Sequence, residues 1–209
     1  MTNVLADIAL ESEAATVLTF RLARAYDEED ELAAVWRRVM TPAAKFWICK
    51  RAPLLAAEAM EVLGGNGYVE EYVLARIYRE LPVNSIWEGS GNIMCLDVLR
   101  GLGRIPGAAE LLSRELTDAA HADKRLASLV SRLDRRLKAD ETNESQARAI
   151  VRDLVLASQA VLLLKYSPTA VAEAFCASRL GDEPGGTFGL LPTGTDLRFI
   201  VDRAAPLQH

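Results

Sequence analysis

Histidine, aromatic residues and clustered cysteines are all scarce in this chain of 209 residues. Its two histidines, His121 and His209, stand alone, and its three cysteines, Cys49, Cys95 and Cys176, have none of the close spacings that bind zinc. We therefore expect no metal site. Aromatic residues are 6% of the chain while alanine and leucine are frequent, which favours helices over sheets.

The chain also lacks a basic excess, an export signal and a long apolar run. Its formal net charge of −5 argues against a dedicated nucleic-acid-binding protein, although it leaves room for a local basic patch. The first ten residues include Asp7 and no basic segment, and the longest apolar stretch, residues 154–164, is too short to cross a bilayer. We expect a cytoplasmic protein that does not span a membrane.

Apolar residues recur at three- and four-residue steps along most of the chain, which predicts helices. Thr41 and Ser167 each precede a proline, so we expect both to cap the helices that follow. Pro82 is expected to exclude a regular helix over residues 81–88. The expected helices are residues 3–26, 30–39, 41–63, 72–79, 91–102, 108–138, 146–166, 168–180 and 195–204.

No strand and no internal repeat are evident, so the fold class that we predict is all-α. We place two helical bundles in the chain, residues 1–103 and residues 104–209. Turn-forming residues mark the boundary between them: Gly101, Gly103, Pro106 and Gly107.

Residues 61–100 contain the features that suggest chemistry. Residues 64–67 end a helix with three glycines, which let other groups approach the backbone closely. Glu88 lies between the large ring of Trp87 and Gly89, just before another helix begins. A helix N-terminus suits a phosphate, and a carboxyl group beside Trp87 in an apolar pocket would have the raised pKa of a general base. The same residues also fit a structural interpretation: a glycine cap, an acid that compensates a helix dipole, and an aromatic core residue.

The segments MEVLGGNGYVEE and RIYRELPVNSIWEGSGN resemble the C-terminal signature of acyl-CoA dehydrogenases. That signature has a Gly-Gly-x-Gly-aromatic turn, an arginine–acid pair, which Arg79 and Glu80 match, and an aromatic-Glu-Gly-Ser motif. The version PVNSIWEGSGNIMCLDVLR resembles the alkylation-response (AidB-like) branch in particular. The resemblance extends over residues 3–102. It implies a four-helix-bundle-type C-terminal domain followed by a second small helical bundle.

The resemblance assigns the chemistry to the turn around Glu88. This residue matches the carboxylate that removes the α-proton of an acyl-CoA thioester while the β-hydride passes to FAD. Trp87 and Gly89 match positions beside the substrate, and tryptophan in place of the tyrosine of many relatives implies short or branched acyl chains. Ser90 and Asn92 match positions that contact the flavin.

A second flavin contact is implied at the glycine turn. Gly64 and Gly65 match the residues that meet the FAD of a neighbouring subunit. Glu61 stands where most of the family has glutamine, and an ionised glutamate would repel a phosphate. Either Glu61 is turned aside or paired, or the flavin contact differs here.

The resemblance further implies an electron-accepting flavoprotein as a partner, and a homo-oligomer. The helical and β-rich domains that precede this region in the family have no counterpart in the sequence. We therefore expect the chain alone to bind little FAD and to have no dehydrogenase activity. Uncovered bundle faces would favour self-association.

The alkylation-response branch is also associated with double-stranded DNA. Five arginines are candidates for non-specific contacts with DNA phosphates: Arg100, Arg125, Arg132, Arg135 and Arg136. A solvated helix face explains the same charges, and no recognition-helix motif is evident. Three interpretations stay open: part of an acyl-CoA dehydrogenase, a DNA-associated protective protein, and a helical interaction module without catalysis. Glu88 favours the first, because a module without catalysis needs no acid there.

Overall fold

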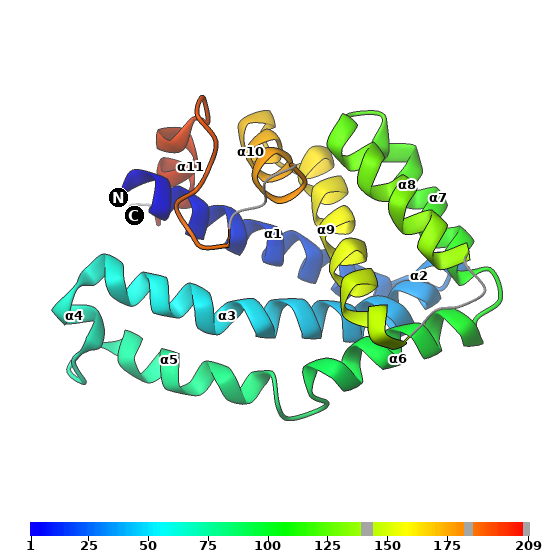
Figure 1. Ribbon diagram of the computed structural model, residues 1–209, viewed down its shortest axis with the longest axis horizontal. Helices are drawn as coiled ribbons and strands as arrows, with labels where there is room; N and C mark the ends of the chain where they lie inside the picture. The colour runs from blue at the N-terminus through cyan, green and yellow to red at the C-terminus, as the bar shows by residue number, and fades with distance from the viewer. Residues whose placement is uncertain (139–143, 182–185, 207–209) are drawn as a thin grey trace.

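The structure is a computed structural model that describes residues 1–138, 144–181 and 186–206. These residues form helices joined by turns, with no strand among them, so the predicted all-α fold is confirmed (Figure 1). In chain order the helices are α1 (Thr2–Asp27), α2 (Glu31–Val35), the π-helix η1 (Trp36–Met40), α3 (Thr41–Leu63), α4 (Gly65–Tyr68), α5 (Val73–Asn84), α6 (Gly91–Arg104), α7 (Ala108–Ala120), α8 (Lys124–Lys138), the 3₁₀ helix η2 (Glu144–Gln146), α9 (Ala147–Tyr166), α10 (Thr169–Arg179) and α11 (Leu197–Ala204).

Helix α9 lies at the centre of the core. Apart from Arg152, every residue from Ile150 to Leu163 is buried. Helices α1, α3, α6, α7, α8 and α10 pack against α9, because a helix that is apolar around its circumference must be covered on every side. The buried side chains form one cluster that extends from Ala6 to Ile200. Segments before and after residue 103 therefore share a core, and the division into two bundles stays a prediction.

Helices α3 and α5 run antiparallel, joined through the short α4, and form a hairpin at one edge of the molecule (Figure 1). The hairpin and the turn that follows it carry many exposed large apolar side chains: Leu54, Leu63, Tyr68, Val69, Tyr72, Val73, Ile77, Tyr78, Val83, Ile86 and Trp87. Exposed apolar surfaces of this size often contact another domain or protein.

The single long helix expected over residues 108–138 is wrong, because the chain folds back between α7 and α8. Asp123 lies at the break, and its Oδ1 accepts hydrogen bonds from the backbone N–H groups of Arg125 at 2.7 Å and Leu126 at 3.1 Å. An aspartate in this position satisfies N–H groups that have no partner inside the helix. Asp123 therefore starts α8, and α7 and α8 pack against each other as a hairpin.

Three expectations based on proline were also wrong. Thr41 caps no new helix, because the backbone stays helical from α2 through η1 into α3, and Thr41 Oγ1 donates to the carbonyl of Arg37 at 2.6 Å. Pro82 lies inside α5, which ends at Asn84; in the last turn it removes a single helical hydrogen bond. Ser167 donates to a glutamate of α1 instead of capping α10.

Candidate functional site

The turn between α5 and α6 contains the motif residues that the sequence singles out. The N–H groups of Ile86 and Trp87 both donate to the carbonyl of Val83, at 2.9 and 3.1 Å. The backbone then takes positive φ at Glu88 (55°) and Gly89 (104°) before α6 begins. In the part of the chain that the structure describes, Glu88 is the sole non-glycine residue with a positive φ.

The left-handed conformation of Glu88 is strained. It costs about 1–2 kcal/mol, because Cβ comes too close to the following carbonyl oxygen. Strain of this kind persists only where the surrounding contacts enforce it, and it clusters at functional sites. The next residue is constrained too, since Gly89 has a φ of 104°, a conformation that residues with side chains rarely adopt. The two residues together give the turn a shape that few sequences can adopt.

Lys45 on α3 holds this turn against the bundle. Its Nζ donates to the carbonyl oxygen of Trp87 at 2.8 Å and also to the carbonyl oxygen of Gly89. The two accepting carbonyls lie on either side of Glu88, so the main chain is anchored where it is strained. Lys45 could not be predicted from the sequence, because no motif connects it with a turn 42 residues later in the chain.

The side chains of the turn are open to solvent in this chain. Trp87 is 58% exposed and Ile86 is 66% exposed, and Glu88 also falls among the exposed residues. The apolar niche expected around the Glu88 carboxyl is therefore not formed by the described residues alone. Any burial of this carboxylate has to come from a molecule or domain that covers the turn.

The start of α6 offers groups that suit a phosphate. Ser90 is the residue before the helix, and its side chain makes no capping hydrogen bond to the first N–H groups of α6. Asn92 is exposed, and its Oδ1 accepts a long hydrogen bond of 3.4 Å from Nε of Arg148. A helix N-terminus without a side-chain cap leaves the first N–H groups of the helix free, and it carries the positive end of the helix dipole. The predicted flavin contacts Ser90 and Asn92 therefore lie at a helix N-terminus, which is a favourable place for an anion.

Glu61, Gly64 and Gly65 lie where α3 turns into α4, at the opposite end of α5 from Glu88 (Figure 1). Gly64 ends α3 with φ 58°, and its N–H donates to the carbonyl of Glu61 at 3.1 Å. A Cβ on Gly64 or Gly65 would meet no atom within 4 Å, so another molecule can approach this backbone closely. The Glu61 side chain is exposed. The structure thus separates the two groups of predicted flavin contacts by the length of a helix.

The arginine–acid pair differs from the one that the motif suggests. Arg79 pairs with Glu70 in the turn before α5, with a 2.8 Å hydrogen bond between Nη2 and Oε2, and not with its neighbour Glu80. Adjacent residues on a helix point in different directions, so Arg79 and Glu80 cannot face each other. Both partners of the observed pair are more than half exposed, and its contribution to stability is expected to be small.

The five arginines that were candidates for DNA contacts do not form one free basic face. Arg125 pairs with an aspartate at the start of α8 and with a glutamate of α10. Arg132 and Arg136 both pair with a buried aspartate of α9. Arg135 is exposed and donates to a backbone carbonyl of its own helix, while Arg100 is exposed on α6. DNA binding by these residues stays a prediction.

Neither metal ligation nor thiol chemistry is suggested by the remaining reactive side chains. Within the described ranges no group of three or more histidine, cysteine, aspartate or glutamate residues is placed to hold a metal ion. Burial raises the pKa of the Cys95 thiol to about 11 and that of the Cys176 thiol to about 12, so both stay protonated.

The helices of the described residues include none that is long and apolar enough to cross a membrane.

The geometry of the turn and the helical fold agree with comparisons to known proteins. The family model for the acyl-CoA dehydrogenase C-terminal domain matches residues 1–103. The chain is also 49% identical over 187 residues to the putative acyl-CoA dehydrogenase AidB of Escherichia coli K12, which is 89% of this chain and 34% of that protein. Residues 1–103 are an acyl-CoA dehydrogenase C-terminal domain.

Other relatives share this domain and its C-terminal extension. Acyl-CoA dehydrogenase family member 11 of Caenorhabditis elegans is 28% identical over 186 residues, which is 86% of this chain and 29% of that protein. The chain therefore spans about a third of the length of these curated relatives.

Two solved structures have the same fold. Bd2924 in its apo form superposes with a TM-score of 0.66 and 27% identity, over 77% of this chain and 32% of that one. The C. elegans ACDH-11 structure in complex with C11-CoA superposes with a TM-score of 0.69, over 93% of this chain and 37% of that one; at 24% identity this likeness shows the fold alone. Its coverage includes most of the extension that follows the acyl-CoA dehydrogenase domain.

Proposed function

We propose that this chain is the C-terminal part of an FAD-dependent acyl-CoA dehydrogenase and that Glu88 is the base that removes the α-proton of the substrate. The observation that carries the proposal is the left-handed backbone at Glu88, the motif position of the carboxylate. Glycine would relieve the strain there, so a turn that served structure alone gains nothing from glutamate. The two hydrogen bonds from Lys45 support a turn that is held in this shape for function.

In the proposed reaction the α-C–H bond of an acyl-CoA thioester breaks, its proton goes to the Glu88 carboxylate, and a hydride leaves the β-carbon. Bound FAD supplies the acceptor for that hydride. An α-C–H is a weak acid, so the base must be close and poorly solvated and the thioester oxygen must be polarised. The backbone N–H of Glu88 is one donor to that oxygen in this proposal, and Gly89 leaves room for the substrate to lie against the chain. Since Glu88 is exposed here, substrate and flavin have to exclude water from it.

The residues present fit the flavin in two separate places. Ser90, Asn92 and the uncapped start of α6 would hold the phosphate end of one FAD. Gly64 and Gly65, whose backbone is open to close approach, would meet the FAD of a second subunit. Their separation along α5 supports contacts with two different flavins in a homo-oligomer, and the exposed apolar side chains of the α3–α5 hairpin supply a surface for such an assembly.

The substrate and the electron acceptor are proposed at the level of chemical class. The C. elegans neighbour was solved in complex with C11-CoA, and a Bos taurus relative that is 35% identical over 94 residues is named short-chain specific acyl-CoA dehydrogenase. We favour short or branched acyl-CoA thioesters, because the ring of Trp87 is large. A relative that is 30% identical over 90 residues is named as a subunit of a caffeyl-CoA reductase–Etf complex, which supports an electron-transferring flavoprotein as the acceptor.

A chimeric enzyme tests the role of Glu88. The C-terminal third of the E. coli relative is replaced by this chain, and acyl-CoA-dependent reduction of an artificial electron acceptor is measured. We expect Glu88→Gln to lower turnover by at least about a hundredfold, the scale of a lost general base, while flavin absorbance and thermal stability stay unchanged. Glu110→Gln, at an exposed glutamate of α7 outside the motif, is the matched control and should leave turnover unchanged.

Unchanged turnover in the Glu88→Gln chimera would remove Glu88 as the base. The chain by itself is proposed to bind little FAD and to have no dehydrogenase activity. A yellow and active preparation of the 209 residues alone would contradict that second statement without bearing on the first.

The alternative of a DNA-associated protective protein receives no particular support from the arginine positions, because three of the five arginines already pair with acidic side chains. Binding of non-specific duplex DNA should weaken steeply with salt if arginines contact phosphates. A salt titration with the 209-residue chain tests this alternative, and the absence of any salt-dependent binding would exclude it.

A further inference from the structure

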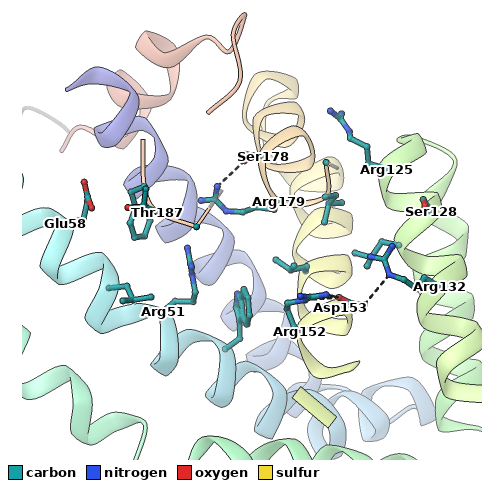
Figure 2. A pocket seen from close by; sticks show the side chains of 18 of the residues that line it. Arg51, Glu58, Arg125, Ser128, Arg132, Arg152, Asp153, Ser178, Arg179 and Thr187 are labelled. Carbon is teal, nitrogen blue, oxygen red and sulfur yellow. Dashed lines mark hydrogen bonds and ion pairs between the residues drawn. The ribbon is translucent and has the colours of Figure 1, made fainter. Parts of the chain in front are cut away.

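A pocket of about 820 Å³ lies between α3, α8, α9 and the segment around the end of α10 (Figure 2). It is distinct from the proposed dehydrogenase site, because none of its lining residues belongs to residues 61–100, which carry the motif. Its size falls within the range of about 300–1,000 Å³ that is typical of small-molecule sites. Most of its wall comes from the extension after residue 103, and α3 contributes the rest.

One wall of the pocket carries positive charge that the described residues do not neutralise. Asp153 on α9 has a side chain that is 1% exposed, and it pairs with three guanidinium groups: Arg136 at 2.7 Å, Arg152 at 2.7 Å and Arg132 at 3.5 Å. Across the described residues Asp153 is the sole acidic partner of these three arginines. A single carboxylate can balance a single charge, so this cluster keeps an excess of two positive charges.

Two of those arginines, Arg132 and Arg152, line the pocket, and Figure 2 shows both beside Asp153. Lys124 lines it as well; this lysine is exposed and makes no ion pair or hydrogen bond within the described part of the chain. The described lining therefore includes these three cations, Lys124 and Arg132 on α8 and Arg152 on α9. Glu58, the acidic residue at the rim, lies on α3 across the pocket from Arg132 (Figure 2).

The opposite wall is aromatic and electrically balanced. The guanidinium of Arg51 lies 5.8 Å from the centre of the Trp47 ring and 5.3 Å from the centre of the Phe188 ring. Arg51 forms two 3.0 Å hydrogen bonds with Glu11, and Arg179 pairs with Glu11 and with a buried aspartate of α1. Flat faces of this kind accept a planar or apolar group by stacking and by burial of its surface.

Two buried donors near this wall have no acceptor. Nε1 of Trp47 and Nε of Arg179 are both shielded from solvent, and neither has a hydrogen-bond partner in the described chain. Both residues line the pocket. An unpaired buried N–H is costly, and each such group calls for a missing acceptor. The excess positive charge is the feature that a ligand in the pocket would balance, and oxygen acceptors on an anionic ligand would do so.

We propose that this pocket binds a small organic anion in which a phosphate, sulfate or carboxylate head group is attached to a planar apolar body. The head group lies against Arg132, Arg152 and Lys124, and the body lies over Trp47 and Phe188. Guanidinium groups suit oxyanions because their N–H groups form paired, charge-assisted hydrogen bonds. Duplex DNA is disfavoured, because the cations line a concave pocket between helices and not an outer face along which successive phosphates could lie.

Isothermal titration calorimetry on the 209-residue chain tests the site with 1-naphthyl phosphate, which has both a head group and a planar body. Inorganic phosphate and 1-naphthol each lack one of the two parts and should bind at least about tenfold more weakly, since each loses one set of contacts. The double variant Lys124→Gln/Arg152→Gln should weaken binding of 1-naphthyl phosphate by about tenfold or more. Asp153 keeps two arginine partners in this variant, so the buried carboxylate stays paired.

The double variant Arg104→Gln/Arg114→Gln removes the same charge from exposed positions outside the pocket and should leave binding unchanged. Ser128→Trp provides an uncharged test, because Ser128 is exposed on the pocket wall and a bulky side chain there should block the pocket without disturbing the core. Equal weakening by both charge variants, or equal binding of 1-naphthol, would overturn the proposal. Displacement of the probe by a short DNA duplex would also overturn it, in favour of nucleic acid. None of these results depends on Glu88, so they are independent of the dehydrogenase test.

Discussion

Lys45 and Trp87 lie 42 residues apart in the chain, yet the ammonium of one donates a 2.8 Å hydrogen bond to the carbonyl of the other. Together with its second bond, to the carbonyl of Gly89, this lysine ties α3 to the turn that begins α6. The turn has a strained backbone at Glu88 and exposed side chains, so few other contacts hold it in place. The placement of the proposed base therefore depends on a residue outside the family motif.

Replacing Lys45 by methionine removes the ammonium group and both of its hydrogen bonds, and keeps an unbranched side chain as far as Cε. We expect faster amide exchange in the segment from Trp87 to Gly89, measured by hydrogen–deuterium exchange, and a loss of about 1 kcal/mol in the free energy of unfolding. Lys50→Met is the control, because Lys50 is an exposed lysine of the same helix without a hydrogen bond to the turn in the described structure. Equal exchange in the two variants would show that Lys45 does not anchor the turn.

Two glycines of the turn after α3 have different surroundings, since Gly67 is packed against Met60 and Gly65 faces open space. A Cβ on Gly67 would lie 2.2 Å from the carbonyl oxygen of Met60, so Gly67→Ala forces the backbone apart and should lower the free energy of unfolding by about 1–3 kcal/mol. A Cβ on Gly65 meets no atom within 4 Å, so Gly65→Ala should change stability by less than about 0.5 kcal/mol. Urea denaturation of the two alanine variants makes the comparison. Similar losses in both would contradict it.

The helical fold could be predicted from the sequence because its signals are local. Spacing of apolar residues identifies each helix from neighbours a few positions away, and Gly64 ends α3 where the glycine run predicts. The break at Asp123 was missed, since the apolar spacing continues across it and neither glycine nor proline marks it. A capping aspartate was the available signal, but it is weak because most aspartates on helical segments face solvent.

The candidate site could be predicted in part. The motif places Glu88, Ser90 and Asn92 together at the start of α6, because all three lie in one short segment. No local pattern predicts that Lys45 on α3 holds this turn, or that a pocket lies between α3, α8 and α9. Both depend on how distant helices pack. The same reason applies to Asp153, a buried acid whose arginine partners on α8 precede it by 17 and 21 residues.

Asp153 should be among the residues that the fold tolerates least. Asp153→Asn removes the acidic partner that three guanidinium groups share in the described structure. Because those arginine side chains are 32–49% exposed, water partly replaces the carboxylate, and the cost is about 1–3 kcal/mol. We expect a loss of that size in the free energy of unfolding by urea denaturation. Glu173→Gln is the control, because Glu173 is 62% exposed in its pair with Arg125 and should contribute no more than about 1 kcal/mol. A loss below about 1 kcal/mol for Asp153→Asn would mean that the arginines are sufficiently solvated without it.

Glu11 makes the stability of the α1–α3 packing depend on pH. Burial by itself raises the pKa of this carboxyl, but hydrogen bonds and charges from Arg51 and Arg179 outweigh that effect and hold the pKa below its ordinary value of 4.5. Between the lowered folded pKa and the unfolded pKa, the unfolded chain binds more protons at this position, so stability rises with pH. The stabilisation by ionised Glu11 is therefore complete above the unfolded value and is lost as the pH falls through the folded value.

Comparison of the wild-type chain with Glu11→Gln isolates this contribution. The wild type should be the more stable protein at neutral pH, and the difference between their free energies of unfolding should shrink as the pH falls below about 4.5, because protonated glutamate and glutamine are both uncharged. Chemical denaturation at a series of pH values between neutral and acidic gives the two curves. A difference that stays constant through the acidic range would mean that Glu11 stabilises the fold by packing and neutral hydrogen bonds, and that its charge against Arg51 and Arg179 adds nothing.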